Sequence, residues 1–316
     1  MRRFQNILFI ANHGADKHGL VGRAARLATV NKARLTLFDA LDLEDESRSG
    51  PATQSAVQEL NQVQVETRLN ELEELRDSIG ADFPDLDIGV DVGVGELATT
   101  AIRAVLSEQY DLVMKMPEGS ASPLRVLFGS SDQKLMRKCP CPVWIIKPSE
   151  NEHFKRILAA VNMNHTVPES KPLTQLIMAL GTSLAADEQC ELHVLHAWQL
   201  AGEVKLRGRQ IHVRKVEQIL KDMEGAHKSE LEALLEDFPY ERRDVHLVKG
   251  SAAEIIPKFV EEREIDLVVI GTVGRSGIPG LLIGNTAERV LNAVDCSVLT
   301  VKPEGFETPI EAAAWT

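Results

Sequence analysis

The chain has 316 residues, of which 44% are hydrophobic and 26% charged, and its formal net charge at pH 7 is −12. This composition is typical of a globular protein with room for two domains, and the acidic balance argues against nucleic-acid binding through a broad basic face. The longest apolar runs, such as Val143 to Ile146, are too short to span a bilayer, so we expect no membrane insertion. Four cysteines are too few for a disulfide scaffold and indicate a cytoplasmic protein.

Short apolar runs alternate with segments of helical periodicity along the first half. Asn6–Ala11, which follows the N-terminus directly, is typical of a buried parallel strand and not of a signal peptide. Between residues 57 and 75, apolar residues that include Leu60 and Val63 recur at helical spacing in a long polar helix. In chain order we expect strands at 6–11, 34–38, 86–92, up to 115 and 143–146, with helices at 21–31, 57–75, 97–106 and after 129.

The second half repeats this pattern. Asp111-Leu112-Val113 returns 155 residues later as Asp266-Leu267-Val268, and Gly129 returns as Gly284. Each half is long enough to bury its own core, so the repeat indicates a duplicated domain and not a solenoid. We predict the α/β class: two tandem five-stranded parallel sheets with helices on both faces. The predicted bounds are 1–150 and 151–305, with a C-terminal tail at 306–316.

The linker between the halves is short, because Pro148 is followed within six residues by Phe154. Short connections favour packing of one domain on the other, and we therefore expect an internal pseudo-dimer. Tandem chains could pair further as homodimers, a point that the sequence leaves open.

A glycine-rich loop follows the predicted strand Leu267–Ile270, with glycines at 271, 274 and 284. Glycine at a strand end permits backbone angles and a close ligand approach that a Cβ would prevent. Gly284 stands just before the last predicted helix, whose first amides would form an anion site suited to phosphate. Ligands of doubly wound sheets bind outside the carboxyl ends of the strands, where this loop is predicted to lie. The alternative is that the glycines only make turns.

Gly-x2-Gly-x9-Gly followed by a small polar residue resembles the nucleotide signature of the universal stress protein family, and the resemblance covers the chain as two family domains. It implies a fold similar to the adenine nucleotide alpha hydrolases, binding of ATP (with or without Mg²⁺) in the second half, and a role in stress resistance. By position it implies adenine contacts at the first two strand ends, and ribose and phosphate contacts in the loop. The implied residues are Ala160, Val161, Asn162, Ala197, Gly271, Gly274, Gly284, Asn285, Thr286 and Ala287.

Two implied site residues depart from the family pattern. Asn162 stands where nucleotide-binding members usually have aspartate, although an amide side chain offers both a donor and an acceptor to adenine. Asn285 replaces the usual serine or threonine and keeps the backbone amide.

The first half departs further from the pattern. It has Met116, Pro117 and Glu118 in the loop, which add a bulky side chain, remove an amide and introduce a carboxylate. Gly129-Ser130-Ser131 keeps the helix start, and we expect it to retain an anion site. We predict that this half is structural or binds something other than ATP.

Two other functions are open at this stage. The first is a carrier or sensor of a partly apolar, non-nucleotide ligand bound in the first half or between the halves. It is suggested by the apolar residues near the altered loop: Met114, Met116, Leu124, Val126, Leu127 and Phe128. The second is ATP hydrolysis, for which Glu288 is the nearest carboxylate, although a helix cap is the simpler role. The sequence contains no plausible pair of nucleophile and base, so we expect a binding protein and not an enzyme.

Three further patterns have structural explanations. Gly93-x-Gly95 formally resembles a dinucleotide motif, but it comes late in its domain and is better explained as a helix start. Cys139 and Cys141 lack the further ligands that a metal site needs. His193 and His196 fall on a predicted strand, where we expect histidines of the core with their hydrogen bonds satisfied.

Overall fold

The computed structural model describes residues 4–11, 17–43, 54–118, 128–148, 153–163, 170–200, 213–272 and 284–312. The chain divides into two compact units, one built mainly on residues 1–152 and the other mainly on residues 153–305. Among the described helices, none combines the length with the apolar character that crossing a membrane requires.

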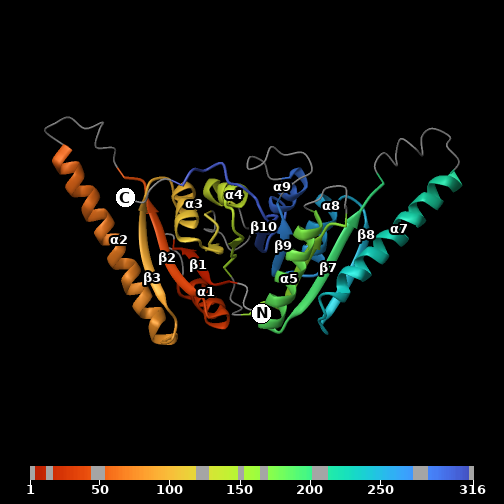
Figure 1. The fold of residues 1–316 in the computed structure, drawn as a ribbon, viewed down its shortest axis with the longest axis horizontal. Helices are drawn as coiled ribbons and strands as arrows, with labels where there is room; N and C mark the ends of the chain where they lie inside the picture. Colours follow the sequence, from red (N-terminus) through yellow and green to blue (C-terminus); the bar gives the residue numbers. More distant parts are fainter. Residues whose placement is uncertain are drawn as a thin grey trace. The chain divides into compact units, whose positions relative to one another are not determined.

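The first unit contains five parallel strands in the order β3-β2-β1-β4-β5 (Figure 1). Its strands are β1 Asn6–Ile10, β2 Arg34–Leu41, β3 Ile88–Val94, β4 Leu112–Lys115 and β5 Val143–Ile145. Its helices are α1 Lys17–Asn31, α2 Gln54–Asp82, α3 Leu97–Glu108 and α4 Ser130–Lys138.

The second unit repeats this topology as β8-β7-β6-β9-β10. Its strands are β6 Arg156–Val161, β7 Glu191–Trp198, β8 Arg243–Lys249, β9 Leu267–Gly271 and β10 Ser297–Val301. Its helices are α5 Ser170–Glu188, α7 Val213–Glu236, α8 Ala252–Glu262 and α9 Asn285–Leu291. The predicted α/β class, with a five-stranded parallel sheet in each half, is confirmed.

The order of the strands places a topological switch point in each unit. In the first unit the chain moves outward from β1 to β3 and then returns to β4, on the other side of β1. Right-handed crossovers then put α1 and α2 on one face of the sheet and α3 and α4 on the other, and the helices of each pair contact one another. The carboxyl ends of β1 and β4, and of β6 and β9, therefore lie side by side where ligands bind in such sheets.

The sequence repeat is visible in the hydrogen bonds that set the strand register. Asp111, just before β4, accepts the amides of residues 5 and 6 at 2.6 and 3.1 Å. Asp266, just before β9, accepts the amides of residues 155 and 156 at 2.7 and 2.8 Å. In both halves one carboxylate thus fixes the start of the first strand against the start of the fourth.

The Gly93-x-Gly95 segment is a helix start, as predicted. Gly95 has a φ of +119°, a conformation that favours glycine, and Glu96 is the N-cap residue of α3. The Glu96 carboxylate accepts the Thr99 amide at 2.9 Å, so the segment turns β3 into α3.

The apolar stripe predicted for α2 is wrong in its first half. Leu60 and Val63 are 49% and 56% exposed, whereas Arg68 is buried at 2% exposure. The Arg68 guanidinium donates to the Asp39 carboxylate at 2.7 Å and to the Ala11 carbonyl oxygen, at the ends of β2 and β1. A buried arginine with these acceptors is stable in the interior, and helical spacing of apolar residues gives no sign of it.

Candidate functional site

The residues that the resemblance assigns to adenine lie at the carboxyl ends of β6 and β7. Ala160 and Val161 end β6 and are buried, and Asn162 follows them as an exposed residue. Ala197 is half-buried on β7, directly after His196, the register partner of Val161. The structure therefore brings these four predicted residues to one edge of the sheet.

The backbone carbonyls at this edge already accept hydrogen bonds. The Val161 oxygen accepts from His196 Nδ1 at 3.2 Å, and the Asn162 oxygen accepts from Thr174 Oγ1 at 2.9 Å. Because His196 Nδ1 carries the proton, its Nε2 accepts from His227 Nδ1 of α7, 3.2 Å away. His196 is thus a satisfied core histidine, as expected. No local sequence pattern indicated the hydrogen bond between His227 and His196, because the two histidines are 31 residues apart.

Gly271 ends β9, and its lack of a side chain serves packing. A Cβ built at Gly271 would lie 2.6 Å from Leu173 Cδ2 of α5. The space that we expected to admit a ligand is therefore taken at this point by a leucine side chain. Gly274, the second glycine of the motif, lies outside the described residues.

Gly284 is held to the end of β9 by backbone hydrogen bonds. Its amide donates to the Thr272 carbonyl at 2.8 Å, and the Thr272 amide donates to Val301 of β10 at 3.1 Å. Thr272 is 1% exposed, so this connection is buried. The start of α9 is therefore fixed beside the carboxyl ends of β9 and β10.

The first turn of α9 presents backbone amides at this edge. Its first intrahelical hydrogen bond runs from the Glu288 amide to the Gly284 carbonyl at 3.0 Å, so the amides of Asn285, Thr286 and Ala287 come before it. Asn285 and Thr286 are exposed, whereas Ala287 is buried at 6% exposure. Such a turn can hold an anion through amides and the helix dipole without any basic side chain. Glu288 lies in the same turn.

The equivalent helix start in the first half is occupied by the chain's own carboxylates, which corrects our expectation of an anion site there. Glu118 Oε2 accepts the Ser131 amide at 3.3 Å, and a Cβ at Gly129 would overlap the Glu118 carboxylate. Asp132 Oδ2 accepts the amides of Gly129 and Glu118, each at 2.9 Å. The amides of Gly129 and Ser131 at this helix start are therefore already bonded to carboxylates.

A buried ion pair supports this arrangement. Lys115, the last residue of β4, and Asp132 of α4 are both 0% exposed, and Lys115 Nζ donates to Asp132 Oδ1 at 2.6 Å. Lys115 Nζ also donates to the Met116 carbonyl oxygen at 2.9 Å. The second half has Ile270 and Ala287 at these two positions, so it carries neither charge.

The described part of the apolar neighbourhood in the first half belongs to the core. Met114 is 0% and Met116 9% exposed, and Phe128 is half-buried. Leu124, Val126 and Leu127 lie outside the described residues. The contacts that the structure describes thus favour packing over a ligand surface for the two methionines.

Fold and site together define a tandem of two doubly wound α/β domains that differ at the switch-point helix start, where the first has Glu118 and Asp132 and the second has Val273 and Ala287. The model of the Universal stress protein family matches residues 3–147 and 153–302. The chain therefore belongs to the universal stress protein family, with two family domains in tandem.

Relatives of known family support this assignment. The Universal stress protein E homolog of Haemophilus influenzae is 28% identical over 315 residues, which cover 95% of this chain and 98% of that protein. Universal stress protein E of Escherichia coli is 31% identical over 212 residues, 66% of each chain. Among solved structures, a functionally unknown protein of Pseudomonas aeruginosa matches with a TM-score of 0.71 at 23% identity, over 96% of this chain and 95% of the other. A universal stress protein of Archaeoglobus fulgidus matches with a TM-score of 0.60 at 17% identity, over 97% and 100%. The two structures show a shared fold.

Proposed function

We propose that this chain is a nucleotide-binding regulator of stress resistance whose second half holds ATP. The observation that carries the proposal is the contrast between the two helix starts. In the first half, the Glu118 and Asp132 carboxylates accept the amides at the start of α4. The second half has Val273 and Ala287 at the corresponding positions, which supply no competing carboxylate.

The phosphates and the adenine would each have a matching group at this edge of the sheet. The phosphates would accept the amides of Asn285, Thr286 and Ala287, at the positive end of α9. Adenine would lie near Ala160, Val161 and Ala197. We propose that the Asn162 side chain reads the base, because an amide offers both a donor and an acceptor. Mg²⁺, where present, would bind the phosphates, as it does in other nucleotide sites.

A binding protein fits this chain better than a hydrolase. The sequence contains no evident pair of nucleophile and base, so we propose that nucleotide occupancy acts by changing contacts with a protein partner. We further propose a cytoplasmic location, domain bounds at 150 and 305, and an internal pseudo-dimer. The proposed nucleotide site does not depend on these three points.

Native mass spectrometry of the whole chain, with and without ATP and Mg²⁺, tests the site. We expect one nucleotide per chain, lost in Gly274→Val and kept in Gly119→Val, the matched substitution in the first half. A nucleotide that survives Gly274→Val, or is lost equally in both variants, would contradict the assignment to the second half. A different co-purified mass that depends on Gly119 would favour the carrier of an apolar ligand.

A second pair of variants tests the reason for the contrast. Val273→Glu introduces a carboxylate where the first half has Glu118, and we expect it to abolish ATP binding by competing for the amides of α9. Glu118→Val is the reverse exchange and should leave ATP binding in the second half unchanged. Undiminished binding in Val273→Glu would show that an acid at this position does not block the helix start.

A further inference from the structure

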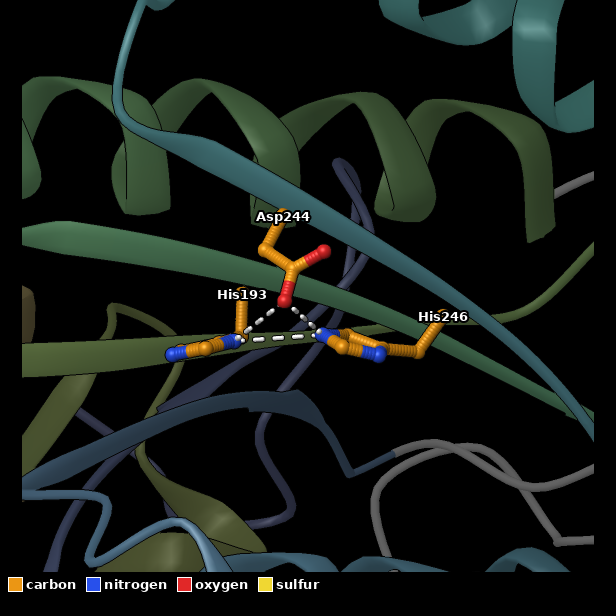
Figure 2. A group of neighbouring side chains, drawn as sticks. All are labelled: His193, Asp244 and His246. Atoms are coloured by element: carbon orange, nitrogen blue, oxygen red, sulfur yellow. Dashed lines mark hydrogen bonds and ion pairs between the residues drawn. The ribbon is translucent and has the colours of Figure 1, made fainter.

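Three side chains with metal-binding groups meet on the second unit, near the amino ends of two adjacent parallel strands. His193 comes from β7, and Asp244 and His246 come from the edge strand β8 (Figure 2). His193 is the register partner of Asp244, and His246 is two residues further along β8. Residues two apart on a strand point to the same face, so all three project together. Gly271 and Gly284 lie at the opposite, carboxyl edge of the sheet.

The distances between the three ligand atoms match one face of a zinc tetrahedron. His246 Nε2 is 3.1 Å from both His193 Nδ1 and Asp244 Oδ2, and His193 Nδ1 is 3.8 Å from Asp244 Oδ2. Bonds of about 2.0–2.2 Å from zinc to nitrogen and oxygen imply about 3.3–3.6 Å between ligand atoms in a tetrahedron. An ion would therefore fit with only small side-chain movements.

Hydrogen bonding alone accounts poorly for this arrangement. Asp244 Oδ2 can only accept, so its contact with His246 Nε2 at 3.1 Å needs a proton on that nitrogen, whereas His193 Nδ1 lies at the same distance from the same nitrogen and would have to share that proton or meet it with its own. His193 Nε2 is buried and has no hydrogen-bond partner among the residues described, so the expectation of a satisfied core histidine is wrong for His193. A cation would accept all three lone pairs at once. The proton of His193 would then reside on Nε2, which faces Glu191 Oε2 at 3.7 Å.

The surroundings hold the two imidazoles in place. Phe259 of α8 packs against the rings of His193 and His246 at centroid distances of 5.7 and 4.6 Å. Burial lowers the pKa of both histidines, against the opposing effect of the Asp244 carboxylate.

The charges around the cluster are mixed, and a hollow borders one of its three residues, His193. Asp244 is 58% and Glu191 50% exposed, and both add negative charge. Arg263 and Arg156 add positive charge, but Arg156 is paired with Glu264 at 2.9 Å. A hollow of about 240 Å³ is lined by His193 together with Arg156, Glu191, Glu262, Arg263 and Glu264.

We propose that His193, Asp244 and His246 bind a divalent transition-metal ion of the zinc class, with the fourth position open to water. Two imidazoles and one carboxylate suit zinc and its neighbours in the first transition row better than calcium or magnesium, which prefer oxygen ligands alone. The ion would join the edge strand β8 to β7. The site is separate from the proposed nucleotide site and does not depend on it.

Titration of the whole, untagged and chelator-treated chain with Co²⁺ tests this site. We expect one equivalent to bind with the visible absorption of tetrahedral cobalt, and Zn²⁺ to displace it. Loss of a partner that only orients a ligand weakens metal binding about 10–100-fold, so His246→Gln and Asp244→Asn should each weaken it at least about tenfold. Asp244 is exposed, so Asp244→Asn tests the site even if His246→Gln fails to fold.

Two control variants separate this cluster from other sources of binding. Glu241→Gln removes an exposed acid just before β8 and should leave the affinity unchanged. Cys141→Ser removes one thiol of the Cys139–Cys141 pair, whose sulfurs are 3.5 Å apart, and should also have no effect. Three results would overturn the proposal: no stoichiometric Co²⁺ binding, undiminished binding in both Asp244→Asn and His246→Gln, or loss of binding in Cys141→Ser.

Discussion

The buried ion pair between Lys115 and Asp132 predicts a large, strongly coupled effect on the stability of the first unit. Both side chains are 0% exposed, and Asp132 also accepts the amides of Glu118 and Gly129. Removing one partner of a buried pair leaves the other charge uncompensated, at a cost of about 3–5 kcal/mol. We therefore expect Lys115→Ile and Asp132→Ala each to lower the free energy of unfolding by about that amount.

The double variant has a smaller expected cost, because the second half carries the same apolar pair at these positions. Replacing both members of a buried ion pair by apolar residues is often neutral or stabilising by about 1–4 kcal/mol. Against this, the amides of Glu118 and Gly129 lose their acceptor, which costs about 1–3 kcal/mol each where water does not replace it. The double variant should thus lose clearly less than the sum of the two single variants.

Urea unfolding followed by tryptophan fluorescence measures this coupling. Trp144 is buried in the first unit, so replacing Trp198 and Trp315 by Phe leaves a reporter for that unit. The exposed Asp87, 3.7 Å from Arg34, supplies a control: Asp87→Asn should change the stability by less than about 0.5 kcal/mol. Single variants that cost less than about 1 kcal/mol, or a double variant equal to their sum, would refute the reasoning.

Two further predictions rest on pKa shifts. Burial raises the pKa of Cys190 to about 12, so alkylation at pH 8, mapped by mass spectrometry, should modify Cys141 before Cys190. The stability of the native state should also fall as the pH rises from about 9 towards 12, because the Cys190 thiol ionises in the unfolded chain before it ionises in the folded protein. Burial acts to raise the pKa of Glu96, but hydrogen bonds from Lys134 and Thr99 outweigh it and lower the pKa. Glu96→Gln should therefore destabilise α3 by about 0.5–1 kcal/mol at neutral pH and by less as acid protonates Glu96 in the parent chain, and an unchanged difference in acid would contradict this account.

Sequence patterns were sufficient for features determined by neighbouring residues. The helix predicted at 97–106 is α3 Leu97–Glu108, and the strand that ends at Lys115 is β4. These signals are local: apolar runs, helical periodicity and glycines that start helices. The internal repeat added the domain organisation, because two copies of one alternating pattern can only form the same fold twice.

Contacts between residues that are far apart in the sequence could not be predicted from such local patterns. Leu60 and Val63 of α2 are exposed, whereas Arg68 of the same helix is buried because its acceptor Asp39 lies on β2. His193 meets His246 across 53 residues only because β7 and β8 pair in one register. A shift of that register by one residue would send Asp244 and His246 to the other face of the sheet.

The sequence by itself determined that this protein is a tandem α/β protein of the universal stress protein family and that its two halves differ at the glycine loop. Only the tertiary structure decided what that difference does. Met116 and Pro117 mark the first loop as altered, but the Glu118 carboxylate reaches the start of α4 because β4 and α4 are packed together by the Lys115–Asp132 pair. The sequence determines which side chains the chain carries, whereas packing determines from which donor each carboxylate accepts a hydrogen bond.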